Sequence, residues 1–264
     1  MARRLALVTG ASAGIGAAFA RTLAAQGCDL ALTARRGERL EALAAELRAR
    51  HGIDVLTLVA DLADPAAPAA LEAALTADGR AVDILINNAG YGLPGTFGGN
   101  AWGDHAATLQ VMLSAPCELA HRLLPGMLRR GYGRIVNVAS VAGLTPGGVG
   151  LYGPVKRYLI GFSQSLHMEC VGTGVQVSAL CPGLTWSEFH DVNGMRDPLD
   201  TATPAWLWMD AETVVAAGLA AVEANCPVCV PGPANKTLAL LAWLLPDTWV
   251  MALTAAQGWR FRKP

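Results

Sequence analysis

Charged side chains are scarce in this 264-residue chain. Asp, Glu, Lys and Arg together make up 16% of it, and 20 basic residues are balanced by 21 acidic ones. A chain without excess positive charge gives no support for a nucleic-acid partner or an anionic lipid surface. A cleavable apolar leader is also missing, since Met1–Arg4 run directly into a strand-like segment. We therefore expect a cytoplasmic protein that binds a small molecule and no nucleic acid.

Cysteine offers no sign of a disulfide framework or a metal centre. The six cysteines lie mostly inside apolar runs, and without an export signal free thiols are expected. Cys226 and Cys229 form a C-x-x-C pair, but no second pair of ligands accompanies them. A lone pair of this kind is poor support for metal or redox chemistry. We predict no metal site.

Apolar residues are abundant, at 53%, and occur in short runs separated by longer amphipathic segments. Runs without polar alternation suit parallel strands that are covered on both faces. The expected strands are residues 5–8, 30–32, 55–59, 84–86, 135–138, 175–180 and 228–230. Their alternation with helical segments predicts an α/β fold: a doubly wound, seven-stranded parallel sheet with helices on both faces, of the Rossmann type.

No internal repeat or long linker divides the chain, so we predict a single dinucleotide-binding and catalytic domain over residues 1–264. Two segments depart from the regular alternation. Residues 190–210 contain two prolines and two tryptophans between a strand and a helix, which indicates a substrate loop. Residues 235–264 are apolar but too short to span a bilayer. For this segment a core or oligomer-contact helix interrupted by Pro246 is favoured over a lipid or partner contact.

A glycine-rich turn follows the first expected strand and opens a helix. It reads T-G-x-x-x-G-x-G over Thr9–Gly16. Glycines allow a tight turn, and the positive end of the helix attracts a pyrophosphate. A glycine turn alone is weak evidence, but its place after the first strand of a parallel sheet favours dinucleotide binding. The candidate contacts are Gly10, Ser12, Gly14, Ile15 and Gly16.

The end of the second expected strand lacks an acidic residue. Dinucleotide-binding sheets commonly carry one there, to accept a hydrogen bond from the ribose 2′-hydroxyl. This chain has Thr33-Ala34-Arg35-Arg36 instead. An arginine can bind a 2′-phosphate bidentately, so Arg35 predicts NADP(H) as the cofactor. The alternative is that both arginines form the solvated start of the next helix.

Tyr152 and Lys156 are four residues apart at the start of a helical segment, and therefore share a face. A buried ammonium near a phenol favours the phenolate and lowers a pKa that is about 10 in isolation. Such a tyrosine can donate its proton to a carbonyl oxygen, or accept one in the reverse reaction. Ser140 ends the fifth expected strand, where its hydroxyl could hold the same oxygen. These three are the candidate catalytic residues.

In this order, the motifs resemble those of the short-chain dehydrogenase/reductase family. The resemblance covers residues 5–190 and rests on Thr9–Gly16, Asp61, Asn87-Asn88-Ala89-Gly90, Ser140, Tyr152 with Lys156, and Pro182-Gly183. It implies that Asp61 meets the adenine edge, and that Asn88 and Gly90 lie on the adenosine ribose side. It also implies that Tyr152 and Lys156 contact the cofactor, Lys156 at the nicotinamide ribose, and that Thr185 and Ser187 border the carboxamide. Family members are usually homodimers or homotetramers, which the resemblance implies here.

One position departs from the family pattern. The family usually has an asparagine in the helix after the fourth strand, where it fixes a helix distortion whose carbonyl holds a water near the lysine. Here that position is Met112, and a thioether is a weak acceptor and no donor. The intact Ser140, Tyr152 and Lys156 favour an NADP-dependent reductase or dehydrogenase of ketones and secondary alcohols. Met112 favours the alternative, an NADPH-binding sensor or scaffold with little turnover.

The substrate is expected to be hydrophobic, because the loop from His190 to Met209 is rich in large apolar residues and aromatic walls favour lipophilic ligands. They are Met195, Leu199, Trp206, Leu207, Trp208 and Met209. The alternative is that some of them anchor the loop to the core.

Overall fold

The computed structural model describes residues 3–146, 150–188 and 203–258 of the chain. Its centre is a sheet of seven strands in the order β3-β2-β1-β4-β5-β6-β7, and every strand pair is parallel. The strands are β1 (Leu5–Thr9), β2 (Asp29–Ala34), β3 (Val55–Val59), β4 (Val82–Asn87), β5 (Gly133–Val138), β6 (Val175–Leu180) and β7 (Val228–Cys229). The doubly wound parallel sheet predicted from the sequence is confirmed.

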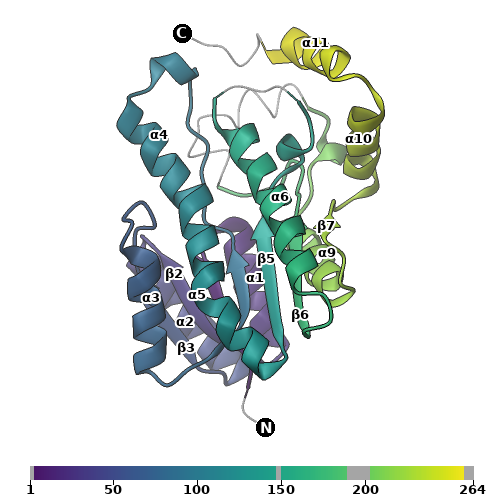
Figure 1. Ribbon diagram of the computed structural model, residues 1–264. Helices are drawn as coiled ribbons and strands as arrows, with labels where there is room; N and C mark the ends of the chain where they lie inside the picture. The colour runs from purple at the N-terminus through teal and green to yellow at the C-terminus, as the bar shows by residue number, and fades with distance from the viewer. Residues whose placement is uncertain (1–2, 147–149, 189–202, 259–264) are drawn as a thin grey trace.

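Helices cover both faces of this sheet (Figure 1). One layer contains α1 (Gly14–Ala25), α2 (Gly37–His51) and α9 (Ala211–Glu223), and the other contains α3 (Ala67–Ala77), α5 (Ala115–Arg130) and α6 (Tyr152–Glu169). Strand β1 shows why both faces are covered: Ala6 and Val8 pack into the first layer, and Leu5 and Leu7 into the second. Successive side chains of a strand point to opposite faces, so a fully apolar strand needs two covers.

The helical segments between β4 and α9 that belong to neither layer lie around the carboxyl ends of the strands. They are 3₁₀ turns at Phe97–Gly99, Val141–Gly143 and Ala205–Leu207, α4 (Trp102–Leu109), and a π-helical turn at Gln110–Ser114 that leads into α5. The strand order reverses between β1 and β4, and ligands of doubly wound sheets bind at this switch point, outside the carboxyl ends of the strands. The topology therefore places the site between the loops that follow β1 and β4.

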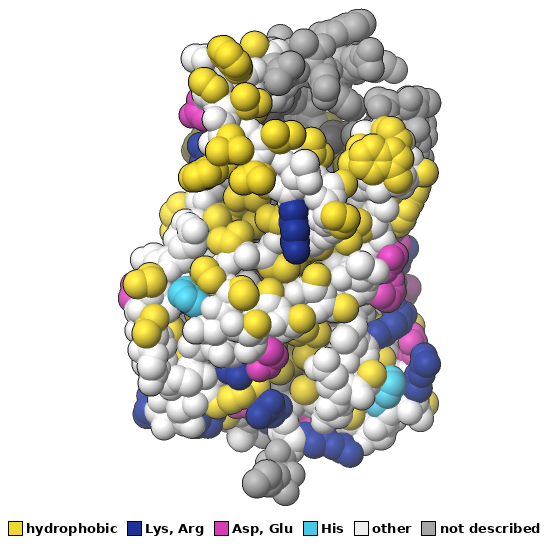
Figure 2. Space-filling view, turned by 90° about the vertical axis from the view of Figure 1, so that its right-hand side faces the viewer, with side chains coloured by type: hydrophobic (Ala, Val, Ile, Leu, Met, Phe, Trp, Pro, Cys, Tyr) yellow, Lys and Arg dark blue, Asp and Glu magenta, His cyan; other side chains and the backbone are white. Residues whose placement is uncertain are grey.

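The C-terminal apolar segment forms two helices, α10 (Pro233–Leu244) and α11 (Asp247–Gly258), interrupted at Pro246. Most of its large side chains are exposed, among them Leu238, Leu241 and Leu244, with Trp243 78% exposed, whereas Val250 is buried. Figure 2 shows hydrophobic side chains gathered in the upper half of one face of the molecule, with most charged ones in the lower half. No helix within the described residues is long and apolar enough to cross a membrane. Residues 259–264 of the predicted segment lie outside the described part.

Candidate active site

The glycine-rich turn has the conformation that its sequence requires. Gly10 and Gly14 adopt positive φ angles of 66° and 53°, which glycine tolerates without steric cost. A Cβ on Gly16 would lie 2.3 Å from the Gly10 carbonyl oxygen, so only glycine allows the helix to approach the turn this closely. Helix α1 begins after Ala13 without a side-chain cap. Its first amides are thus left for an anionic ligand.

Hydrogen bonds from β4 hold this turn in place. The Thr9 hydroxyl donates to the Ile86 carbonyl at 3.2 Å and accepts from the amides of Asn88 and Ala89 at 2.9 and 3.0 Å. The Asn88 side-chain amide donates to the carbonyls of Thr9 and Gly10 at 2.9 and 3.3 Å. Asn88 therefore shapes the phosphate turn from behind, a contact that the sequence resemblance did not specify.

The other predicted cofactor contacts lie in the segments that follow β3, β4 and β6. Asp61 follows β3, where its carboxylate accepts from the Ala63 amide at 3.0 Å. Gly90 lies beside the catalytic candidates, since a Cβ there would be 3.6 Å from Lys156 Nζ. Thr185 is buried, and a Cβ on Gly14 would be 2.9 Å from the Cβ of Ser187. Ser187 therefore packs directly against the glycine turn.

The two arginines after β2 differ in their surroundings. Arg35 is exposed, and within the described residues it shows no hydrogen bond or ion pair. Arg36 donates to the Ser12 hydroxyl at 3.2 and 3.0 Å and pairs with Glu188 at 2.8 Å. Arg39 pairs with the same carboxylate at 2.6 Å. Sequence reasoning missed Arg36, Arg39 and Glu188 as a group, because 149 or more residues separate the arginines from the acid.

Ser140, Tyr152 and Lys156 come together near the carboxyl end of β5. Ser140 caps the 3₁₀ turn that follows β5, its hydroxyl accepting from the Ala142 amide at 3.2 Å, and it hydrogen-bonds the Tyr152 phenol. Lys156 is buried and donates to the Val138 carbonyl at 2.8 Å. Its Nζ lies 5.6 Å from the centre of the Tyr152 ring. The hydroxyls of Ser140 and Tyr152 can thus hold a single carbonyl oxygen.

The pKa of Tyr152 is opposite to the sequence expectation. Burial raises the pKa of the phenol to about 12, against a lowering by the Ser140 hydrogen bond. Burial also lowers the pKa of Lys156 to about 8. The reason is that removal from water disfavours the charged form of both groups. A smaller fraction of Lys156 is therefore positively charged at alkaline pH. At neutral pH Tyr152 is a protonated phenol, which is the form that donates a proton.

A buried polar chain fixes helix α6, which carries Tyr152 and Lys156, to the sheet. Asn87 on β4 donates to the side-chain oxygen of Asn137 on β5 at 2.8 Å, and Asn137 donates to Ser163 on α6 at 2.9 Å. All three side chains are buried, where such hydrogen bonds specify one arrangement. Sequence reasoning missed Asn137 and Ser163, although a polar residue inside the apolar run of β5 was an available signal.

Met112 lies inside the π-helical turn Gln110–Ser114. Its side chain is 1% exposed, and its sulfur would be 3.1 Å from a Cβ on Gly90. The helix distortion that the family resemblance assigned to an asparagine is therefore present with methionine at this position. Methionine fills the space beside Lys156, as a flexible thioether can.

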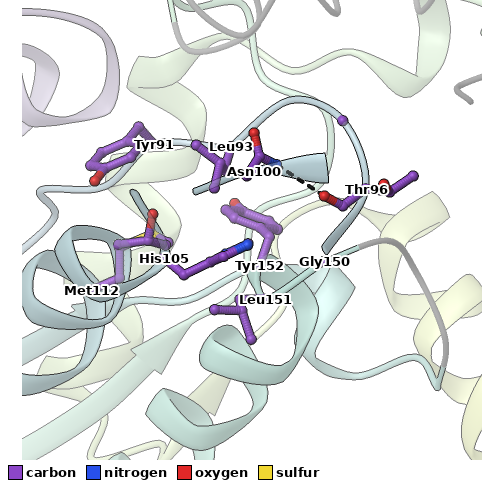
Figure 3. A pocket seen from close by; sticks show the side chains of 11 residues that line it. Tyr91, Leu93, Thr96, Asn100, His105, Met112, Gly150, Leu151 and Tyr152 are labelled. Atoms are coloured by element: carbon purple, nitrogen blue, oxygen red, sulfur yellow. Dashed lines mark hydrogen bonds between the residues drawn. The ribbon is translucent and has the colours of Figure 1, made fainter. Parts of the chain in front are cut away.

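A pocket opens in front of Tyr152 (Figure 3). Its wall is mixed: apolar side chains come from the segment after β4, the π-helical turn and the start of α6, and polar ones mainly from residues 96–108. The lining residues are Tyr91, Leu93, Gly95, Thr96, Asn100, His105, Thr108, Met112, Gly150, Leu151 and Tyr152. Among the described residues, no cluster of His, Cys, Asp or Glu suits a metal ion.

His105 is the polar lining residue that sequence reasoning missed. It is buried, and its Nε2 lies 2.9 Å from the Phe97 carbonyl oxygen. Because a carbonyl only accepts, Nε2 must carry a proton, which leaves Nδ1 of a neutral ring as an acceptor. Nδ1 is buried without a partner in the described part of the chain.

The predicted substrate loop is described only in part. Its residues up to 202, Met195 and Leu199 among them, lie outside the described residues. Trp208 is buried and stacks on Trp186 with ring centres 4.3 Å apart, beside a backbone bridge between Thr185 and Met209. Trp206 is 71% exposed. Trp208 therefore anchors the end of the loop, which is the alternative that the sequence left open.

Comparison with protein families decides the relationship. The family model described as short chain dehydrogenase matches residues 4–195, most of the chain. The chain belongs to the short-chain dehydrogenase family. The family membership predicted from the motifs is confirmed, and with it an oxidoreductase acting on alcohol or carbonyl groups.

Relatives of this short-chain dehydrogenase cover about three quarters of its length or more. Nodulation protein G of Rhizobium sp. (strain N33) is 38% identical over 87% of this chain and 93% of its own. An NADP-dependent 3-hydroxy acid dehydrogenase of Salmonella typhi is 36% identical over 73% of this chain and 77% of its own.

Two solved structures share its fold and part of its sequence. A short-chain dehydrogenase from Sphingobium yanoikuyae in complex with NADPH is 34% identical, with a TM-score of 0.80 over 97% of this chain and 94% of that one. The bulky-bulky ketone specific alcohol dehydrogenase from Comamonas testosteroni is 29% identical, with a TM-score of 0.76 over 99% of this chain and 95% of that one.

Proposed function

We propose that this short-chain dehydrogenase is an NADP(H)-dependent oxidoreductase of ketones and secondary alcohols, with a preference for hydrophobic substrates. The observation that carries the proposal is the position of the Tyr152 phenol, which hydrogen-bonds Ser140, lines a pocket and lies near Lys156. A general acid placed at a pocket is what carbonyl reduction requires.

The residues around the glycine turn fit a dinucleotide. A Cβ on Gly10, Gly14 or Gly16 would collide with a neighbouring residue, so only glycine keeps this space free. The uncapped amides of α1 can hold a pyrophosphate. Arginines stand where an acidic residue would select a 2′-hydroxyl, which supports NADP(H) over NAD(H). Binding of NADPH by the Sphingobium yanoikuyae protein, 34% identical, supports the same choice.

The chain's own residues supply proton transfer and orientation. Bound nicotinamide supplies or receives the hydride. Ser140 and Tyr152 hold the carbonyl oxygen of the substrate, and Tyr152 donates its proton to that oxygen as the alcohol forms. Positively charged Lys156 stabilises the resulting phenolate, and the proton is replaced from solvent through water.

A hydrophobic substrate is supported by the apolar part of the pocket wall, Tyr91, Leu93, Met112 and Leu151. The relatives point to more than one substrate class: one is named for bulky ketones and one for 3-hydroxy acids.

The proposal is tested by following NADPH absorbance with a panel of ketones and sugars. We expect a higher kcat/KM for an aromatic ketone than for a sugar of similar size. Equal or better turnover of the sugar would overturn the hydrophobic preference. NADPH binding without turnover of any carbonyl or alcohol would instead support the second candidate, a sensor or scaffold, which the sequence suggested by having Met112 at the position of the family's asparagine.

A further inference from the structure

An ion-pair network closes one edge of the cofactor site. Glu188 accepts from Arg36 at 2.8 Å and from Arg39 at 2.6 and 2.8 Å. Arg36 also donates twice to the Ser12 hydroxyl in the glycine turn. One carboxylate is thus held by two guanidinium groups, one of which is fixed to the phosphate-binding turn.

Glu188 lies between the glycine-rich turn of the cofactor site and the segment that leads into the predicted substrate loop. It follows Ser187, which packs against Gly14, and Trp186, which stacks on Trp208. Arg36 directly precedes α2, and Arg39 lies in its first turn. A negatively charged group from the segment after β6 therefore stands at the adenosine end, beside the end of β2.

We propose that Glu188 is an internal competitor for the cofactor phosphate: it occupies the guanidinium groups of Arg36 and Arg39, beside Ser12, until the 2′-phosphate of NADP(H) displaces it from them. The proposal rests on the cofactor choice made above, and goes beyond it in giving the chain its own competitor for that phosphate. The exchange is non-covalent: one anion replaces another on the same donors.

The chemistry of the two anions favours the exchange. A phosphate monoester carries about −1.5 to −2 charges at pH 7 and three acceptor oxygens, whereas the carboxylate carries one charge and two oxygens. The side chains of Arg36, Arg39 and Glu188 are 43%, 50% and 44% exposed, and ion pairs this exposed are weak. Glu188 is therefore a displaceable occupant that weakens 2′-phosphate binding without abolishing it.

The consequence is a link between cofactor binding and the substrate side of the site. When Glu188 leaves the arginines, the segment that carries Trp186 loses its ion pairs with Arg36 and Arg39 at the start of α2. The fluorescence of the stacked Trp186 and Trp208 should then change when a 2′-phosphate binds, because Trp186 is two residues from Glu188.

The test compares Glu188→Gln with the unmodified protein by titration calorimetry. The probe is 2′,5′-ADP, and the comparison ligand is 5′-ADP, which lacks the 2′-phosphate. We expect Glu188→Gln to bind 2′,5′-ADP about three- to tenfold more tightly, from the loss of two exposed ion pairs, with 5′-ADP unchanged. Arg39→Gln should weaken 2′,5′-ADP alone. Glu223→Gln is the matched control, since it breaks an exposed pair with Arg134 elsewhere and should change neither ligand.

An unchanged or weaker affinity of Glu188→Gln for 2′,5′-ADP would overturn the inference, while NADPH binding by the same protein would leave the proposed function standing. Binding of neither 2′,5′-ADP nor NADPH by the unmodified protein would overturn both. As a second readout, 2′,5′-ADP should change tryptophan fluorescence, and Trp186→Phe should remove that change.

Discussion

The two ends of the active site are built differently. At the cofactor end, the glycine turn is held by the hydroxyl of Thr9 and the side-chain amide of Asn88, which form hydrogen bonds with backbone groups of β1, β4 and the residue after β4. At the substrate end, the pocket wall comes from the segment after β4, the π-helical turn and α6, and the buried Nδ1 of His105 has no partner there within the described residues. The first end is held to the sheet by hydrogen bonds before a ligand binds, whereas the second contains a buried nitrogen without a partner among the described residues.

The largest expected effect breaks the cofactor end. In Gly16→Ala the new Cβ would collide with the Gly10 carbonyl at 2.3 Å and with the Asn88 amide at 2.5 Å. We expect a loss of about 1–3 kcal/mol in the free energy of unfolding, as for other overpacked sites, and loss of NADPH binding. Denaturant unfolding and calorimetry measure both.

Gly161→Ala is the control, because a Cβ there meets nothing within 4 Å on helix α6. It should be neutral or stabilising by up to about 1 kcal/mol. Equal behaviour of the two variants would show that the turn is less rigid than its hydrogen bonds indicate.

The next prediction concerns which of NADPH and NADH the cofactor end prefers. Arg35→Asp should weaken NADPH about tenfold or more and leave NADH unchanged or better, because it removes the predicted Arg35 contact and places a negative charge next to Arg36, where it would repel the 2′-phosphate. Arg50→Asp makes the same charge change in the last turn of α2 and should alter neither cofactor. Tighter binding of NADH than of NADPH by the unmodified protein would sink the NADP assignment.

The pKa of Lys156, which lies between the two ends of the site, predicts that catalysis depends on pH. Its pKa of about 8 means that the charged form dominates below pH 8 and is lost above it, while Tyr152, with a pKa of about 12, stays protonated. The kcat/KM for ketone reduction should therefore fall several-fold as the pH rises from 7 to 9. In Lys156→Arg the charge persists, so whatever activity remains should lose this fall. A flat profile for the unmodified protein would argue against a role of the Lys156 charge.

The smallest expected effect concerns the substrate end. Because the π-helical turn is present with Met112, we expect Met112→Asn to change kcat by no more than about twofold, with NADPH affinity unchanged. Burying an amide beside Gly90 should lower the free energy of unfolding by about 1–3 kcal/mol, and Met112→Leu, which stays apolar, should cost less. A several-fold rise in kcat for Met112→Asn would show that the methionine limits proton transfer.

The same contrast explains what the sequence could predict. Thr9–Gly16 is a local motif whose conformation follows from three glycines and its place after β1, and Tyr152 and Lys156 share a helix turn. The ion pair of Arg36 with Glu188 joins residues 152 positions apart, and His105 becomes a pocket residue only through packing near Phe97. Such contacts depend on how β2, α4 and the segment after β6 meet in space. The predicted low pKa of Tyr152 was wrong because it took account of a buried Lys156 but not of the burial of the phenol, which is the largest cause of the raised pKa.

The central claim is that Tyr152 donates the proton to the substrate, and Tyr152→Phe tests it most directly. The variant removes one hydroxyl from a ring that otherwise keeps its packing. With a ketone that the unmodified protein reduces, turnover should fall by about 10²–10⁴-fold, while NADPH binding and the unfolding midpoint stay close to those of the unmodified protein. Turnover at the unmodified rate, with NADPH bound, would contradict the account.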